Sequence, residues 1–504
     1  MAPGLWRRRL GIGAVLAALI AAAGLSAREA VLLKNRRELF LDNFLLEAIS
    51  GLEYRQGVPV SAGPALAFDQ PWEGSAVAYV SVVSTGEKFQ MYYRGGFGAR
   101  DNENLTCYAE SGDGIHWVRP NLGIFEVNGS KANNVILPPG EPTWATENFC
   151  VLYDSRSGVP ADERYKAVGG GAGNNPQLKF SGLTRGLYRF VSADGIHWRR
   201  LPGEPLFTDF ALDSQNVLAW LPAEQCYAIY LRTWTGDRKG EKFSYKTTRT
   251  VARAISKDFS NWSEPERMTF DQGGVENLYT NTTQPYFRAP QIEISMPFRF
   301  VENKQVLDEA AFKKYEIARS MWRGVSDAVL MSSRGGTHYQ RTFLESFVRP
   351  GLDPANWAAR SNMPGLGVIQ TGPAEMSFFI IRGYTSNQAH LERMTLRLDG
   401  FASLHAGYTV GSATSRPVVL DGSRLSINLS TSASGFVKVV LLDESGRDIP
   451  GFGEAEAEEL TGDAIDLTVA WRGSAKLDEI VGRTIRIKLM LRDADLYSLA
   501  MQDQ

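Results

Sequence analysis

Four acidic residues stand directly before short apolar segments of this sequence. They are Glu73 before "GSAVAYV", Glu147 before "NFCVLYD", Asp213 before "SQNVLAWL" and Glu276 before "NLYTNTTQPYF". Carboxyl groups that converge in a fold can cleave a glycosidic bond, because one protonates the leaving oxygen while another attacks the sugar or activates water. Crowding also raises the pKa of one member, which keeps it protonated near neutral pH. The sequence therefore predicts these four side chains as catalytic candidates, and Glu375 before "MSFFII" as a further one.

Aromatic and basic side chains lie close to these acids in the sequence. Sugar rings stack on aromatic faces, and guanidinium groups bind carboxylates or hydroxyl groups. We therefore predict a substrate-binding set that comprises Asp69, Trp72, Arg94, Trp144, Tyr279, Arg288 and Arg299. Asp69 also competes with Glu73 for the first acidic position. Packing between structural repeats is the alternative role for Trp72, and a surface role is the alternative for Arg94 and Arg299.

A repeated turn indicates which elements position these side chains. "SGDGIHW" at 111–117 returns as "SADGIHW" at 192–198, and looser copies follow at 256–262, at 333–339 and around Asp399, with 64 to 81 residues between copies. Runs rich in β-branched and aromatic residues precede each copy, which is typical of strands. Asp-Gly favours a tight hairpin, because glycine adopts positive φ and aspartate caps the turn. Such regular spacing indicates a repeat architecture.

The predicted fold class is all-β, with a five-bladed β-propeller over residues 31–406 and a C-terminal β-sandwich over 409–504. In this propeller the repeated turns are scaffold, the Trp after each turn packs between blades, and the acids before the inner strands converge on a central funnel. The segment 37–46, "RELFLDNFLL", predicts a strand that completes the last blade, with Asp42 as a minor site candidate. The charged segment 302–325 predicts a loop that contains a short helix.

The first residues have the pattern of a targeting segment. "WRRRL" is basic, "GIGAVLAALIAAAG" is apolar but short for a bilayer span, and Ala27 offers a small residue for cleavage. We predict a secretory signal peptide over residues 1–27, a secreted or periplasmic protein, and no membrane contact after cleavage. An uncleaved membrane anchor is the alternative.

Composition excludes several classes of partner and cofactor. The formal net charge is −2, from 54 basic and 56 acidic residues, so no nucleic-acid partner is expected. The three cysteines and five histidines show no metal-ligand spacing, and the sequence has neither a phosphate-binding loop nor a dinucleotide fingerprint. The sequence therefore predicts no metal and no cofactor, and the candidate residues favour a carbohydrate partner.

The repeated turns, the acids at strand starts and the trailing β-module resemble the five-bladed β-propeller glycoside hydrolases of families 43 and 32. The segments "LFLDNFLLE", "PWE", "RYKAV", "SADGIHW" and "LRDADLYSL" are similar to those of secreted bacterial proteins usually described as glycosyl-hydrolase-like. The resemblance implies a secreted glycoside hydrolase that acts on a poly- or oligosaccharide. It also implies an acidic nucleophile or base on the first blade, a stabilising Asp on a later blade and a Glu as proton donor.

By position, the first of these acids corresponds to Glu73 or Asp69, the stabilising residue to Asp213, and the proton donor to Glu147 or Glu276. The sequence departs from family 32, because "PWEGSA" and "LDSQN" stand where that family has "WMNDPNG" and "RDP". These departures keep other functions open: a non-catalytic carbohydrate-binding propeller, an interaction propeller of the cell envelope, or a polysaccharide lyase.

Overall fold

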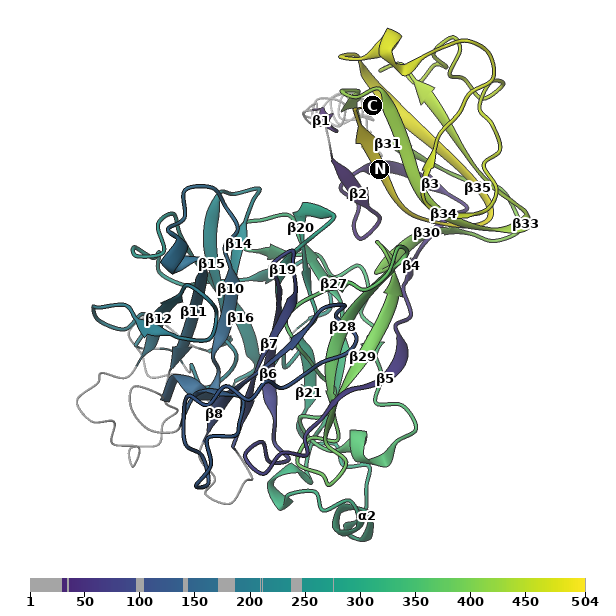
Figure 1. Ribbon diagram of the computed structural model, residues 1–504. Coiled ribbons are helices and arrows are strands. Elements are labelled where there is room, and N and C mark those ends of the chain that lie inside the picture. The colour runs from purple at the N-terminus through teal and green to yellow at the C-terminus, as the bar shows by residue number, and fades with distance from the viewer. Residues whose placement is uncertain are drawn as a thin grey trace, which may run out of the picture. The chain divides into compact units, whose positions relative to one another are not determined.

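The computed structural model describes residues 30–33, 36–96, 104–138, 144–170, 186–208, 210, 212–236, 247–274 and 276–503. Within them the chain is nearly all β-structure, which confirms the predicted all-β class (Figure 1). The chain divides into two units. The larger comprises Leu39–Asp42 and Tyr54–Leu404, and the smaller comprises Asn43–Glu53, His405–Gln504 and the N-terminal segment that ends at Glu38. The predicted signal peptide at 1–27 lies outside the described residues.

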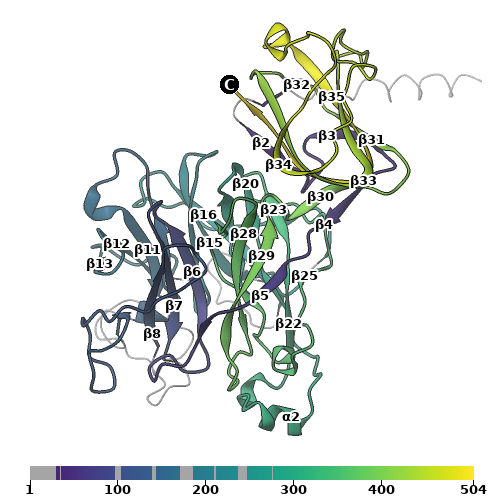
Figure 2. The ribbon, with the colours of Figure 1, turned by 45° about the vertical axis from the view of Figure 1, so that its right-hand side comes forward.

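Three four-stranded antiparallel sheets follow one another along the first part of the larger unit, and in each sheet the strands pair in chain order. Their strands are β6 (Ala78–Ser84), β7 (Phe89–Gly95), β8 (Leu105–Ser111) and β9 (Val135–Leu137); β10 (Cys150–Tyr153), β11 (Tyr165–Gly170), β12 (Leu187–Ser192) and β13 (Arg199–Arg200); and β14 (Val217–Leu221), β15 (Cys226–Trp234), β16 (Arg249–Ser256) and β17 (Glu266–Arg267). Figure 2 shows β6, β7 and β8 side by side. Such consecutive four-stranded meanders are typical of propeller blades.

The second part of the larger unit has shorter strands and smaller sheets. Its sheets are β19-β20-β23, β21-β22-β25, β18-β24, and a last sheet in which β28 pairs with β26, β27 and β29. The strands are β18 (Thr269–Phe270), β19 (Gln284–Tyr286), β20 (Ala289–Ser295), β21 (Phe298–Val301), β22 (Val325–Val329), β23 (Met331–Ser333), β24 (His338–Tyr339), β25 (Ser346–Val348), β26 (Met363–Pro364), β27 (Ile369–Gln370), β28 (Glu375–Arg382) and β29 (His390–Arg397).

Helices are few and short. The predicted helix within 302–325 is present as α2 (Glu309–Lys314), and it begins where the Asp308 side chain accepts a hydrogen bond from the Ala311 N–H. Single 3₁₀ turns are η1 (Trp144–Glu147), η2 (Ala161–Glu163), η3 (Arg319–Met321), η4 (Pro354–Trp357) and η5 (Leu477–Ile480). Among the described residues, no helix has the length and apolar character needed to cross a bilayer.

The last sheet of the larger unit is completed by β5 (Val60–Ala67), which pairs antiparallel with β29. The predicted closing strand at 37–46 is therefore wrong, because β2 (Arg37–Leu39) pairs instead with β35 (Thr484–Gln502). Gly63 and Pro64 made β5 an unpromising strand in the sequence. Proline is tolerated at the edge of a sheet, where its missing N–H leaves no ladder bond unmade.

Backbone hydrogen bonds join the last sheet of the larger unit to the first sheet. Val82 N donates to the Leu366 carbonyl over 2.7 Å, and Leu366 N donates to the Val80 carbonyl over 2.8 Å. The buried Gln215 amide of the third sheet also donates to the Val80 carbonyl, over 3.1 Å. Cys150 is buried there and accepts from Leu218 N, so it behaves as a small core residue, as the sequence predicts.

The repeated turns are scaffold, as predicted. In the first copy, Asp113 accepts hydrogen bonds from the backbone of Ile115 and His116 and from the His116 ring. Hydrogen bonds from His116 are the main reason that the pKa of Asp113 lies below its ordinary value. The second and third copies repeat these bonds around Asp194 and Asp258. Both carboxylate oxygens of each of these aspartates thus accept hydrogen bonds within its own turn.

The Trp residues after the turns pack between sheets, which confirms their predicted role. The Trp117 ring of the first sheet lies 5.5 Å from the Phe379 ring of the last sheet, at an interplanar angle of 85°. The Trp198 ring of the second sheet lies 6.3 Å from the Tyr92 ring of the first. Edge-to-face aromatic pairs of this kind add to the apolar burial between sheets.

The last two copies of the turn differ from the first three. At the fourth, Gly335 replaces the aspartate and a Cβ there would lie 2.9 Å from the Glu224 carboxylate, which occupies the space. At the fifth, Asp399 is fully buried and binds the Tyr286 hydroxyl and the Arg288 guanidinium. Asp399 follows β29, but no hairpin strand comes after it, because β5 already pairs with the free edge of β29.

Substitution of Gly195 is expected to destabilise the protein strongly. Gly195 has φ +76°, and a Cβ there would lie 2.4 Å from the Tyr92 hydroxyl and 2.8 Å from Tyr165 Cε1. Gly195→Ala should lower the free energy of unfolding by about 2 kcal/mol from overpacking and a further ~1 kcal/mol from backbone strain. Gly86→Ala is the matched control, because Gly86 has φ +87° and open space around it. Equal losses in denaturant titrations of the two variants would refute the packing role.

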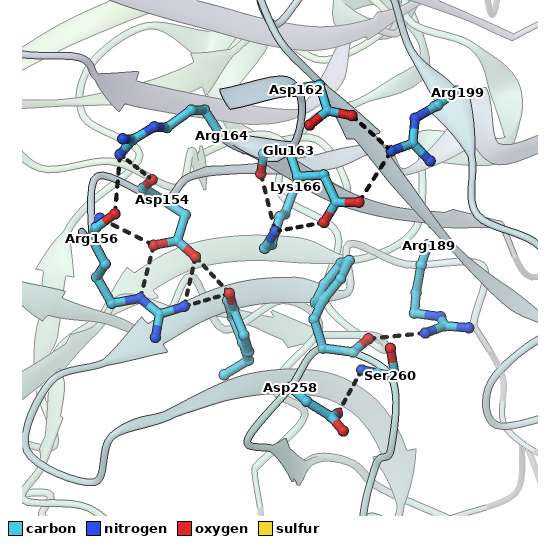
Figure 3. Close-up of polar contacts among 12 residues, drawn as sticks. Asp154, Arg156, Asp162, Glu163, Arg164, Lys166, Arg189, Arg199, Asp258 and Ser260 are labelled. Atoms are coloured by element: carbon cyan, nitrogen blue, oxygen red, sulfur yellow. Dashed lines mark hydrogen bonds and ion pairs between the residues drawn. The ribbon is translucent and has the colours of Figure 1, made fainter. Parts of the chain in front are cut away.

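Charged residues of the second sheet contact the third sheet through hydrogen bonds and cation–π interactions (Figure 3). Asp154, which follows β10 and is buried, accepts two hydrogen bonds from Arg156 and one from the Tyr227 hydroxyl of β15. The Arg156 guanidinium also lies 3.3 Å from the Trp220 ring of β14. Each charge has a partner within the network, and buried charges are stable only in that condition.

The smaller unit combines both ends of the described chain. β1 (Val31–Leu32) pairs in parallel with β32 (Val418–Val419), and β3 (Leu46–Ser50) pairs antiparallel with β31 (Gly411–Ser415). Because of this pairing, most residues before position 54 belong to the smaller unit. The prediction places all residues from 31 to 406 in the propeller and begins the second domain at 409. The remaining strands of the unit are β33 (Arg424–Leu442), β34 (Asp463–Thr468) and β35, and the strands β4 (Glu53–Gln56) and β30 (Ala402–Ala406) each contain residues of both units. The sandwich over 409–504 stays a prediction.

Candidate functional site

Glu147 and Asp213 are brought together by the loops that lead into the inner strands of two neighbouring sheets. Glu147 ends η1 before β10, and Asp213 stands just before β14. The buried amide of Asn148 donates to the backbone carbonyls of Leu212 and Ser214, the residues on either side of Asp213. A satisfied buried amide of this kind fixes the backbone segments it joins. Two of the four predicted acids are therefore held as neighbours.

Two buried arginines lie behind these carboxylates. Arg94 Nη1 of β7 lies 3.9 Å from Glu147 Oε1, and Arg232 of β15 forms an ion pair with Asp213. The arginine side chains are 6% and 3% exposed, whereas both acidic side chains are 30% exposed. The carboxylates are thus the accessible members of each pair, and the guanidinium groups orient them from behind.

Three tyrosines and a third arginine complete the group, which we call the central cluster: Tyr79, Arg94, Glu147, Asp213, Arg232, Tyr279, Arg360 and Tyr384. Arg94 donates to the Tyr384 hydroxyl over 2.9 Å and lies 4.8 Å from the Tyr79 ring centre. Arg232 and Arg360 each lie 5.4 Å from the Tyr279 ring centre. Guanidinium groups are attracted to aromatic faces, so the rings hold the cations in place around the acids.

The electrostatic surroundings of Glu147 favour its protonated form. Burial is the largest cause and raises the pKa of the Glu147 carboxyl; the Asp213 charge raises it further. The charges of Arg94, Arg232 and Arg360 oppose this rise without cancelling it. A carboxyl group whose pKa is raised beside a second carboxyl group is the arrangement that lets a pair of acids work as proton donor and base or nucleophile.

Two members of the central cluster have left-handed backbone conformations. Tyr79 has φ +56° and lies inside the register shift between Ala78 and Ser81, where β6 bulges away from β7. Arg360 has φ +63°. Non-glycine residues in this region carry strain of about 1 kcal/mol or more, and they concentrate at active and binding sites. Bulges also re-aim a side chain, and here the Tyr79 ring meets Arg94.

Glu73 lies outside the central cluster and is fully buried. It accepts from the Tyr93 hydroxyl over 2.6 Å, from Arg119 Nε over 2.8 Å and from the Gln70 backbone over 3.1 Å. Burial raises the pKa of Glu73, and the Arg119 charge opposes that rise. Asp69 is exposed and lies 3.5 Å from the same arginine. These contacts describe a satisfied buried ion pair.

Trp72, next to Glu73, packs against the core of the first sheet, and its indole N–H donates to the Asn134 side chain over 2.8 Å. This is the packing role that the sequence left as the alternative. The backbone of Trp144 begins η1, but its side chain lies outside the described part of the structure. Tyr279 is the aromatic candidate that the fold places in the central cluster.

Glu276 belongs to a second group of charges. It binds Arg299 over 3.0 Å and the buried Arg341 over 2.6 Å, and Arg299 also makes two bonds to Asp327. Glu276, Arg299 and Asp327 line a cavity of about 710 Å³ together with Trp357. Arg288 lies elsewhere again, paired with the buried Asp399. The structure therefore distributes these residues over four separate places, and the further candidates Glu375 and Asp42 pair elsewhere, with Arg393 and Arg334 respectively.

Four members of the central cluster were not predicted from the sequence: Tyr79, Arg232, Arg360 and Tyr384. A signal for Arg232 was present, since "YYRG" in β7 and "YLRT" in β15 place an arginine at the same position of the second strand. Arg360 and Tyr384 stand in irregular segments before β26 and after β28, where no periodicity marks them. Among the described residues, no three His, Cys, Asp or Glu side chains lie close enough to hold a metal ion.

No protein-family model and no curated protein matches this chain. Solved structures with a similar fold include an N-acetylgalactosamine deacetylase from F. plautii in complex with blood group B trisaccharide, with 12% identity, a TM-score of 0.43, and coverage of 69% of this chain and 96% of that one. A glycoside hydrolase family 43 arabinoxylan arabinofuranohydrolase from Bacillus subtilis, in complex with cellotetraose, has 8% identity, a TM-score of 0.37, and coverage of 87% and 98%.

A third solved structure comes from glycoside hydrolase family 130, a family of mannoside phosphorylases that contains hydrolases targeting β-1,2-mannosidic linkages in Candida mannan. It has 13% identity, a TM-score of 0.38, and coverage of 69% of this chain and 94% of that one. The functional argument rests on the side chains of the central cluster.

Proposed function

We propose that the protein is a secreted glycoside hydrolase in which the central cluster lies at the funnel of a five-bladed propeller and cleaves a poly- or oligosaccharide. The blade count is supported by the origin of the cluster. Its members Tyr79, Glu147, Asp213, Tyr279 and Arg360 stand at or before β6, β10, β14, β19 and β26, which are edge strands of five of the seven sheets in the described part of the larger unit. Side chains at the starts of inner strands meet at one end of a propeller.

Glu147 is the proposed proton donor. It transfers its proton to the glycosidic oxygen as the bond from that oxygen to the anomeric carbon breaks, so the leaving sugar departs as a neutral alcohol. Asp213, held by Arg232, is the proposed ionised carboxylate, which either attacks the anomeric carbon or takes the proton of the attacking water.

The observation that carries this proposal is the pairing of two accessible carboxyl groups of opposite character. Glu147 is desolvated and has a raised pKa, whereas Asp213 is ion-paired with a buried arginine. Glu73 and Glu276 each lie in a separate, fully paired cluster, so the proposal assigns them structural roles.

A screen of the mature protein against a panel of polysaccharides tests this proposal, with both binding and released sugar as readouts. The proposal expects release of sugar from at least one member of the panel. Binding without any release would favour the non-catalytic carbohydrate-binding alternative, and neither binding nor release would overturn the carbohydrate assignment.

A further inference from the structure

Arg360 is the arginine of the central cluster with no acidic partner in direct contact among the described residues. Its backbone N–H donates to the Ser326 hydroxyl over 3.1 Å, its guanidinium lies 5.4 Å from the centre of the Tyr279 ring, and Tyr384 is within its electrostatic reach. The side chain is largely buried and within electrostatic reach of Glu147. A guanidinium has five N–H donors, and a charge removed from water is costly unless an opposite charge meets it.

The central cluster as a whole also contains more cationic than acidic side chains among the described residues. Arg94 faces Glu147 and Arg232 faces Asp213, so each carboxylate already has a guanidinium beside it. Arg360 is the third cation against these two acids. Its left-handed φ of +63° holds it in a conformation that costs free energy, which folding tolerates where the residue serves a site.

We propose that Arg360 binds an anionic group on the substrate sugar, a carboxylate or a sulfate, and that the substrate is therefore an acidic polysaccharide. Arginine suits this task because its planar fork of donors matches both oxyanions with paired hydrogen bonds. Tyr279 and Tyr384 hold the fork in place before the ligand arrives, which limits the entropy lost on binding. This inference rests on the proposed function, since it names the substrate class of the same site.

The test compares matched polysaccharides that differ only in charge: a polyuronate with its carboxyl-reduced form, and a sulfated polysaccharide with its desulfated form. The wild-type protein should cleave at least one acidic member and prefer it over its neutral counterpart. Arg360→Gln should lower kcat/KM on that acidic substrate by about 10- to 100-fold more than it lowers kcat/KM on the neutral form. A preference within the polyuronate pair would identify the anionic group as a carboxylate, and a preference within the sulfated pair would identify it as a sulfate.

Arg360→Lys keeps the charge without the fork and should recover only part of the loss, which also covers the case in which Arg360→Gln folds poorly. Arg299→Gln is the matched control, because Arg299 already binds Glu276 and Asp327 and should not alter the preference for acidic substrates. Equal cleavage of both members of each pair by the wild-type protein, or an equal loss on both by Arg360→Gln, would overturn the inference and leave the hydrolase proposal standing. No release from any polysaccharide would overturn the hydrolase proposal itself, and tighter binding of the acidic member would still support the role of Arg360.

Discussion

Glu147→Gln is expected to lower kcat for glycosidic cleavage by about 10³-fold, because the amide cannot give the leaving oxygen a proton. Asp213→Asn should cause a loss of similar size, since it removes the ionised carboxylate that attacks the sugar or activates water. Both variants keep the size of the side chain and leave Asn148 in place between the two loops. Initial rates of sugar release under saturating substrate measure the effect.

Glu276→Gln is the matched control for these two variants. Its side chain is 27% exposed, close to the 30% of Glu147, and it also lies beside arginine side chains. The control should keep activity within about 3-fold of wild type, because Glu276 lies outside the central cluster. A loss in Glu276→Gln as large as that in Glu147→Gln would move the proton donor to the second group of charges.

Arg119→Met should destabilise the larger unit by about 3 kcal/mol at neutral pH, because it leaves the buried Glu73 carboxylate without its cation. Methionine retains most of the apolar stem, so the loss reports mainly on the charge. Arg199→Met is the control, since Arg199 pairs with Asp162 and Glu163 at the surface and should change stability by less than about 1 kcal/mol.

The stability loss in Arg119→Met should also depend on pH. Burial raises the pKa of Glu73, so folding favours the protonated carboxyl, and stability falls as the pH rises through the folded-state pKa. The Arg119 charge opposes this rise in the pKa of Glu73, so its removal should enlarge the loss of stability at higher pH. The difference between variant and wild type should therefore be smallest near about pH 4 and grow toward neutral pH. A difference independent of pH would contradict the ion-pair explanation.

The sequence was informative about the fold where it repeats. The Asp-Gly turns and the Trp after them predicted the sheets around Trp117 and Trp198, and the structure places these rings between sheets. The closing strand was missed because Gly63 and Pro64 interrupt the strand pattern of β5. Proline is tolerated in a strand only at the edge of a sheet, and the sequence does not show that β5 is an edge strand. The N-terminal pairing of β1 and β3 was missed because strand partners far apart in sequence leave no local signal.

For the site, position before an inner strand identified Glu147 and Asp213 but also Glu73 and Glu276, which follow the same pattern. What separates them is the arginine that reaches each acid. Arg119 covers Glu73 completely, whereas Arg94 and Arg232 approach their acids from the buried side. Sheet register decides these approaches, and a single sequence does not report it. Arg360 and Tyr384 lie in irregular segments before β26 and after β28, where no periodicity of the sequence marks them.

The most direct test of the account is the leaving-group dependence of Glu147→Gln, measured on aryl glycosides of the sugar that the polysaccharide panel identifies. A nitrophenolate leaves without protonation, whereas a sugar alcohol requires it, so loss of a proton donor matters only for the second. We predict that Glu147→Gln loses about 10³-fold in kcat/KM on the oligosaccharide and less than about 10-fold on the dinitrophenyl glycoside. Equal losses on both substrates would contradict the assignment of Glu147 as the proton donor.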